Sequence, residues 1–264
     1  MITIGNDAEF ILTHNDLPVS SVGLLGGTKK IPFPVRLGAL QEDNVLAEIN
    51  IHPAKTVGEW ERNINTVVRQ LKKKLPKPYS ISNLASALYP DQELQCQAAH
   101  EFGCDPDYNA WTGQMNSPPK LPKRLQNLRT AGGHVHIGIE GLNFKEKMQL
   151  IQCLDTLGGI QGILLDTDNR RKLLYGKAGA MRLKDYGVEW RTPSNYWIHD
   201  KQSRAWIFKL ALYCANNWQS LLKLTSKEVV GIINKNKTAE ARYYLSFLKK
   251  HVDLPVHPNL IREK

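Results

Sequence analysis

The stretch Arg170–Arg191, R-R-K-L-L-Y-G-K-A-G-A-M-R-L-K-D-Y-G-V-E-W-R, gathers basic residues around a turn of small residues and ends in a strand-like segment. In that segment Val188 and Trp190 point to one face and Glu189 and Arg191 to the other, because successive strand side chains alternate. A carboxylate and a guanidinium on one face, beside a cationic glycine-containing loop, suit a metal-bound polyphosphate. The same pattern also fits a solvated basic loop that leads into an edge strand.

Three other segments, 1–12, 43–51 and 129–140, show the same alternation, with polar residues two apart and apolar residues between them. If the four segments lie side by side, helices can cover the apolar face, and the polar face becomes a concave charged site. Carboxylates with an imidazole favour Mg²⁺ or Mn²⁺, with phosphates completing the shell. The residues therefore predict an ATP-using enzyme. The polar pairs are Asp7 with Glu9, Glu48 with Asn50, His134 with His136, and Glu189 with Arg191.

Helix signals occupy much of the remaining chain. Thr56 with Glu59, and Asn143 with Glu146, have capping-box spacing and predict helices that run to about Leu75 and Leu165. Further helices are expected at 91–101, 205–224 and 238–251, and the Gly- and Pro-rich stretch 23–34 is expected to be a flap-like loop. We expect one α+β catalytic domain over 1–264, of which 200–264 is a mainly helical C-terminal extension.

Composition limits the functional class. The chain has 264 residues and a formal net charge of +10, which favours an acidic partner such as a nucleotide, a nucleic acid such as DNA, or another polyanion. No signal-peptide pattern or apolar run of about 20 residues occurs, so a soluble cytoplasmic protein without a membrane partner is expected. The four cysteines lie far apart, so neither a disulfide framework nor a thiolate zinc site is indicated.

Five motifs in order resemble the phage-type amidoligase family: G-N-D-A-E-F, D-N-V-L-A-E-I-N, F-G-C-D-P-D-Y-N-A-W-T, R-T-A-G-G-H-V-H-I-G and the stretch from 170 to 197. That family belongs to the carboxylate–amine ligases, with glutamine synthetase and gamma-glutamylcysteine ligase. The resemblance covers about residues 1–200. It implies a glutamine synthetase-like catalytic fold, in which a curved, mainly antiparallel sheet has helices on its outer face and a C-terminal helical layer. It also implies two or more Mg²⁺ (or Mn²⁺) ions.

The resemblance further implies a reaction in which ATP phosphorylates a carboxylate and an amine then displaces phosphate, leaving an amide. Its motifs also assign residue roles. Metal ligands would be Glu9, Glu48, Glu189 and His134, with His136 contacting a phosphate, although the two histidines could exchange these roles. Triphosphate ligands would be Arg171, Lys177 and Arg182, and Arg191 would stabilise the transferring phosphoryl group. Candidates for substrate contacts are Asn50, Arg129, Asp107 and Asn109, and the reaction itself asks for a general base, which could be Asp7 or a residue of the loop 105–109.

Two other function classes fit the same residues. A metal-dependent hydrolase or oxygenase could use His134 and His136 with a glutamate, and a nucleic-acid-binding module could use the basic surface alone. For a ligase, the substrate could be a nucleotide or DNA base, a peptide or protein terminus, or a cell-wall component, in the host cytoplasm if the protein is phage-encoded. The sequence does not indicate the oligomeric state.

Overall fold

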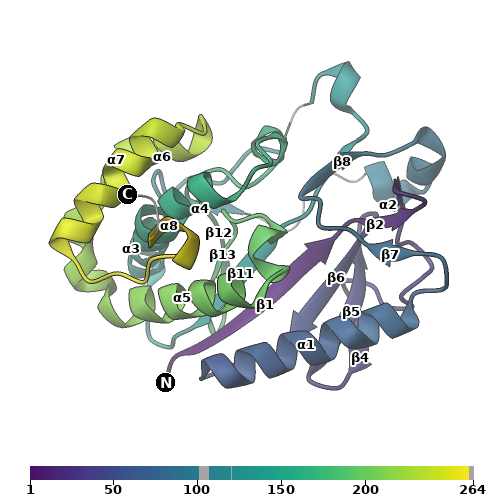
Figure 1. Cartoon of the computed structure of the whole chain (residues 1–264), viewed down its shortest axis with the longest axis horizontal. Helices are drawn as coiled ribbons and strands as arrows, with labels where there is room; N and C mark the ends of the chain where they lie inside the picture. The colour runs from purple at the N-terminus through teal and green to yellow at the C-terminus, as the bar shows by residue number, and fades with distance from the viewer. Residues whose placement is uncertain (101–106, 120, 262–264) are drawn as a thin grey trace.

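Within residues 1–100, 107–119 and 121–261, which the structure describes, an eight-stranded sheet lies at the centre of the protein (Figure 1). The structure is a computed structural model. Neighbouring strands are antiparallel in the order β4-β5-β6-β1-β11-β13-β12-β9, so the predicted α+β class with a large antiparallel sheet is confirmed. The strands are β1 (Thr3–Phe10), β4 (Phe33–Val35), β5 (Gly38–Asp43), β6 (Leu46–Ile51), β9 (Tyr108–Asn109), β11 (Gly133–Gly138), β12 (Ala180–Lys184) and β13 (Gly187–Trp190).

Smaller sheets and helices surround the central sheet. In the described residues, β8 (Ser86–Leu88) pairs with β10 (Leu128–Thr130), and β2 (Leu12–His14) pairs with both β3 (Leu17–Val19) and β7 (Ser80–Ile81). The α-helices are α1 (Val57–Lys74), α2 (Gln97–His100), α3 (Phe144–Leu154), α4 (Ile160–Leu165), α5 (Lys201–Leu221), α6 (Glu228–Asn234), α7 (Thr238–His251) and α8 (Pro258–Ile261). Short 3-10 turns cover Asp91–Leu94, Lys123–Leu125, Arg170–Leu173, Asn195–Ile198 and Leu222–Leu224.

Helices α1, α3 and α5 pack against the central sheet: α1 contacts β5 and β6, α5 contacts β1 and β11, and α3 contacts β12 and β13. Figure 1 shows α1 and α5 running alongside the strands. Helices α6 and α7 pack on α4, at the end of the molecule away from β7 and β8. No helix in the described part of the chain is long and apolar enough to cross a membrane.

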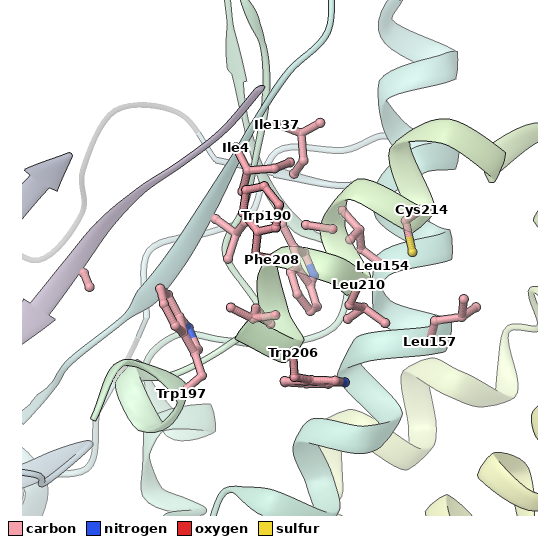
Figure 2. Packing of buried hydrophobic residues seen from close by; sticks show 14 of the residues in the cluster. Ile4, Ile137, Leu154, Leu157, Trp190, Trp197, Trp206, Phe208, Leu210 and Cys214 are labelled. Carbon is pink, nitrogen blue, oxygen red and sulfur yellow. The ribbon is translucent and has the colours of Figure 1, made fainter. Parts of the chain in front are cut away.

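The interface between sheet and helices is the main hydrophobic core. Ile4 of β1, Ile137 of β11 and Trp190 of β13 are almost fully buried, and Phe208 and Leu210 of α5 meet them there (Figure 2). Burial of apolar surface is worth about 25 cal/mol per Å², so this layer supplies much of the folding free energy. Because strand side chains alternate, the polar residues between these apolar ones face the opposite side of the sheet.

A fully buried carboxylate, Asp155, joins the helices to the sheet from a π-helical turn, Asp155–Gly159. It accepts hydrogen bonds from the indoles of Trp111 and Trp190 and from the Thr192 hydroxyl, each at 2.8 Å, and from the Gly179 amide at 2.5 Å. Burial raises the pKa of Asp155, and the hydrogen bonds oppose that shift. These contacts tie the turn before β12 and the end of β13 to the same helix.

The predicted helix after Asn143 is present as α3, the π-helical turn and α4. Asn143 Oδ1 accepts from the Glu146 amide at 3.1 Å, and the Glu146 carboxylate accepts from the Asn143 amide at 2.8 Å, so the capping box is confirmed. Glycines within this helical segment allow close packing against its neighbours. A Cβ at Gly158 would lie 2.4 Å from Leu210 Cδ2 and 2.7 Å from Trp190 Cη2, so a larger residue would require these core side chains to shift.

Two other helix predictions need correction. Thr56 Oγ1 accepts from the Glu59 amide at 3.1 Å as expected, but the Glu59 carboxylate accepts from Lys55, one residue before the cap, at 2.8 Å. The single helix predicted at 91–101 is wrong over the described residues, because the chain forms a 3-10 turn and the short α2 there. Its apolar residues do not recur at helical spacing, so one longer helix would bury little.

We expect Asp155→Ala to lower the free energy of unfolding by about 3–5 kcal/mol, because four buried donors lose their acceptor. Urea denaturation followed by circular dichroism measures the change. Asp185→Ala, at an exposed position in the turn between β12 and β13, is the matched control and should change stability by no more than about 0.5 kcal/mol. Equal stabilities for the two variants would contradict the role assigned to Asp155.

Candidate active site

The strands that carry the four polar pairs are neighbours, in the order β6-β1-β11-β13. Their register places Glu9 opposite Glu48, Asp7 opposite both Asn50 and His134, and His136 opposite Glu189. The polar face borders a cavity of about 690 Å³, a size common for small-molecule sites. The structure therefore brings together residues that are up to about 180 positions apart in the chain.

The first acidic cluster consists of Glu9, Asp43 and Glu48, which all line the cavity and have carboxylate oxygens within 4.8 Å of one another. Burial and the charge of Asp43 raise the pKa of Glu9 to about 7, although the Gly132 amide donates to Glu9 at 2.5 Å. Burial and the neighbouring acids Asp7, Asp43 and Glu9 raise the pKa of Glu48 well above its ordinary range. Carboxylates crowded in this way retain protons or bind a cation.

Two amide side chains orient Glu48. The Gln41 amide donates to Glu48 Oε1 at 2.8 Å, and the Asn50 amide donates to Gln41 Oε1 at 3.1 Å and to Glu48 Oε1 at 3.4 Å. Both residues line the cavity. These hydrogen bonds hold the Glu48 carboxylate beside Glu9 and Asp43 and restrict its rotation, as partners of metal ligands commonly do.

Asp7, His136 and Glu189 form a second cluster, also with ligand atoms within 4.8 Å of one another. Asp7 contacts both imidazoles, with Oδ1 at 3.2 Å from His134 Nδ1 and Oδ2 at 3.0 Å from His136 Nε2. Glu189 lies 3.5 Å from His134 Nδ1 and 3.9 Å from His136 Nε2. The other nitrogen of His136, Nδ1, is 2.7 Å from the Tyr186 hydroxyl, which fixes the ring orientation.

The second cluster has the opposite electrostatic character from the first. Burial acts to raise the pKa of Asp7, but the two histidines hold it well below its ordinary range. Burial and the nearby Arg191 lower the pKa of His134 to about 4, whereas the attraction of Asp7 outweighs burial and raises the pKa of His136. A neutral imidazole suits a metal ligand, and a readily protonated imidazole suits a phosphate contact, so the pair fits both roles.

Three cations surround Glu189 on the β12–β13 side. Arg182 Nη1 is 3.4 Å and Lys184 Nζ is 3.1 Å from Glu189 Oε2, and the Arg191 guanidinium pairs with Glu189 Oε1. Burial and Asp7 act to raise the pKa of Glu189, but Arg191 and the histidines lower it to about 2. Arg182, Lys184 and Arg191 all line the cavity, which gives it a cationic wall opposite the first cluster.

Two of the predicted triphosphate ligands lie outside the cavity wall. Arg171 is buried and donates to the carbonyls of Thr192 at 3.0 Å and Arg191 at 3.2 Å, so it supports the backbone beside Arg191. Lys177 lies in the turn before β12, where its carbonyl accepts from the Thr192 hydroxyl at 3.3 Å. Arg182 alone of the three lines the cavity.

The predicted substrate residues also differ in whether they line the cavity. Asn50 lines the cavity, whereas Asp107 does not line it but lies 3.6 Å from Arg191 Nε. Asn109 accepts from the Trp111 amide at 2.9 Å and donates to the Ala178 carbonyl at 3.4 Å, away from the cavity. Arg129 borders a different hollow and donates to the carbonyls of Gln126, Leu128 and Ala99.

Sequence reasoning missed several residues of the wall. Gln41 and Asp43 are two apart on β5, so the alternation used for the other strands could have found them. Lys29 lies on the loop before β4 and Tyr186 in the turn after β12, where no periodic signal exists. These residues reach the cavity through loop geometry, which the sequence pattern does not report.

Comparison with known proteins identifies the family. Residues 126–249 match the family model described as phage phiEco32-like COOH.NH2 ligase-type 2. The matched region covers 124 of the 264 residues, a little under half of the chain. The matched region contains both histidines of β11 and the β12–β13 segment with Glu189 and Arg191, and the predicted carboxylate–amine ligase family is confirmed. The match supports an enzyme of the carbon–nitrogen ligase class.

Other comparisons add little to this ligase assignment. No curated protein matches the sequence. Among solved structures, a bifunctional glutathione synthetase from Pasteurella multocida is similar, with a TM-score of 0.49 and 12% sequence identity. The match covers 98% of this chain and 45% of that chain, so the ligase spans less than half the length of that protein. A similarity at this level carries no conclusion about fold or substrates.

The proton held by Glu9 should make the stability of the metal-free ligase depend on pH. Its pKa is about 7 in the folded state and 4.5 ordinarily, so its contribution to stability is complete below pH 4.5 and lost as the pH rises through 7. Relative to Glu9→Gln, which does not titrate, the wild-type free energy of unfolding should fall by about 3 kcal/mol over that range. Urea denaturation with a chelator present measures both proteins, and parallel pH profiles would contradict the expectation.

Proposed function

We propose that the protein is an ATP- and Mg²⁺-dependent ligase that joins a carboxylic acid to an amine through an acyl phosphate. The observation that carries the proposal is the cavity over β6, β1, β11 and β13, which is lined by the first acidic cluster, by Asp7 and His136 of the second, and by Arg182, Lys184 and Arg191; Glu189 lies buried beneath these cations. The family match supports the same reaction class. ATP, the divalent metal and the acyl phosphate belong to this proposal.

The donor sets of both clusters fit Mg²⁺ or Mn²⁺. One cluster offers carboxylate oxygens from Glu9, Asp43 and Glu48, and the other offers Asp7, Glu189 and the imidazole of His136. Hard divalent ions prefer oxygen donors and accept an imidazole, whereas cysteine, which favours softer metals, does not contribute to either set. When bound, the ions would neutralise phosphate charge during phosphoryl transfer.

The reaction requires activation of the acid. A carboxylate is a poor electrophile, and an amine at neutral pH forms only a salt with it, so the carboxylate oxygen must first attack the γ-phosphorus of ATP and release ADP. Arg191 would stabilise the charge on the transferring phosphoryl group, and Arg182 and Lys184 would hold phosphate oxygens. The amine nitrogen then bonds to the acyl carbon, phosphate leaves, and the amine loses a proton.

Asp7 is assigned a different role within this proposal from the one expected. A general base should have a pKa near the working pH, but the two imidazoles hold the pKa of Asp7 well below its ordinary range. We therefore propose that Asp7 binds metal and orients His134 and His136. The proton from the amine then goes to another group.

The remaining parts of the proposal come from the sequence. They are a glutamine synthetase-like catalytic fold, a single catalytic domain over 1–264 and a cytoplasmic location, in the host cell for a phage-encoded enzyme. The acid and amine are drawn from nucleotides or DNA bases, peptides and cell-wall components. The hydrolase or oxygenase and the nucleic-acid-binding alternatives are not favoured by the family match.

Removal of either acidic cluster should abolish the reaction. Glu48→Gln and Glu189→Gln are each expected to reduce kcat/KM by about 10³-fold or more, because each removes a charge that the metal ions require. The assay is ADP release from ATP and Mg²⁺ with pools of acids and amines, with the amide identified by mass spectrometry. Glu140→Gln, exposed just after β11, is the control. ADP release that does not depend on the acid, or that yields no amide when acid and amine are both present, would overturn the proposal.

Arg182 on the cationic wall and the exposed motif residue Lys177 are expected to affect ATP binding differently. Arg182→Gln should raise the KM for ATP by about tenfold, because Arg182 lines the cavity. Lys177→Gln should leave that KM within about twofold of wild type, because Lys177 lies outside the cavity wall. Steady-state kinetics at saturating acid and amine measures both, and the reverse order would restore the motif-based assignment.

A further inference from the structure

The loop before β4 carries Lys29 over the acidic side of the cavity. Thr28 and Ile31 exchange backbone hydrogen bonds of 3.0 and 3.1 Å, which turn the chain at Lys29. The Lys29 ammonium lies 3.8 Å from Asp43 Oδ2, and Lys29 and Pro32 both line the cavity. A residue outside the central strands thus contacts the first acidic cluster.

The strand beneath this loop fixes its position. Glu42 of β5 accepts from the amides of Leu25 at 2.9 Å and Gly26 at 3.3 Å, and its own amide donates to the Gly27 carbonyl at 2.9 Å. A Cβ at Gly27 would lie 2.3 Å from the Phe33 amide nitrogen, so only glycine allows the loop to pack this closely. These hydrogen bonds and this close packing hold the loop in place, and the loop positions Lys29 at the cavity.

The charges of the cavity explain why a lysine is placed there. Arg182, Lys184 and Arg191 contact Glu189 on one side, whereas Lys29 contacts Asp43 on the other. A divalent ion binds carboxylate oxygens at about 2.0–2.6 Å, so it interacts with Asp43 more strongly than an ammonium at 3.8 Å. The flexible lysine stem allows the ammonium to move when the metal arrives.

We propose, on the basis of the proposed function, that a divalent ion held by Glu9, Asp43 and Glu48 displaces Lys29 from Asp43, and that Lys29 then binds the carboxylate of the acid substrate. An ammonium is a strong partner for a carboxylate in a partly enclosed site. The acid substrate thus lies on the β5 side of the cavity, between Lys29 and the metal. Lys29 distinguishes an acid from a neutral analogue at this position.

The displacement is tested with Mn²⁺ alone, titrated into the full chain and followed by the electron paramagnetic resonance of free Mn²⁺. Lys29→Gln should bind Mn²⁺ roughly fivefold tighter than wild type, because a unit charge about 4 Å from the site is removed. Lys30→Gln, the exposed neighbour that does not line the cavity, should match wild type. Unchanged or weaker Mn²⁺ binding in Lys29→Gln would overturn the displacement.

Acetate serves as a minimal carboxylate probe for the second half of the proposal. With Mn²⁺ bound, paramagnetic relaxation of the acetate methyl protons should be strong in wild type and Lys30→Gln and fall severalfold in Lys29→Gln. Equal relaxation in all three would overturn the assignment of Lys29 to the substrate. Glu48→Gln separates the two proposals: if it binds Mn²⁺ as wild type does, the proposed metal cluster itself fails, whatever Lys29 does.

Discussion

Carboxylates crowded onto one face of a sheet must be compensated by positive charge or by protons, and this constraint shapes the protein. Each acid is buried or nearly so, and isolated buried carboxylates are costly. The fold compensates the two sides differently. Around Glu189 it supplies two arginines, a lysine and two imidazoles, whereas Glu9 and Glu48 retain protons, as their raised pKa values indicate.

That asymmetry connects structure to chemistry. In the first cluster, where raised pKa values favour the protonated carboxyl groups, a divalent ion would replace the protons as the compensating positive charge. In the second cluster, the guanidinium groups that pair with Glu189 line the cavity, where they would meet the negative charge of the phosphates. The two sides of the cavity therefore suit the two demands of an ATP-dependent ligase, metal binding and stabilisation of the transferred phosphoryl group.

The segment that carries Glu189 and Arg191 is held rigidly from behind. Asp155 bonds to Trp190 and Thr192, and Arg171 bonds to the carbonyls of Arg191 and Thr192. Neither Asp155 nor Arg171 lines the cavity. The basic motif around Arg171 therefore has a supporting function as well as a cationic one, because the Arg171 guanidinium holds backbone carbonyls beside Arg191.

The sequence by itself determined the polar pairs and the main helices, and the resemblance of its motifs predicted the antiparallel sheet and the ligase family. Period-two alternation reports which side chains share a strand face, and capping residues report where helices begin, because both are local properties. Only the tertiary structure decided that Arg171 and Arg129 are buried against carbonyls, that Asp43 completes an acidic cluster, and that Lys29 reaches it. Those outcomes depend on strand order, register and loop support, which arise from contacts between residues far apart in the chain.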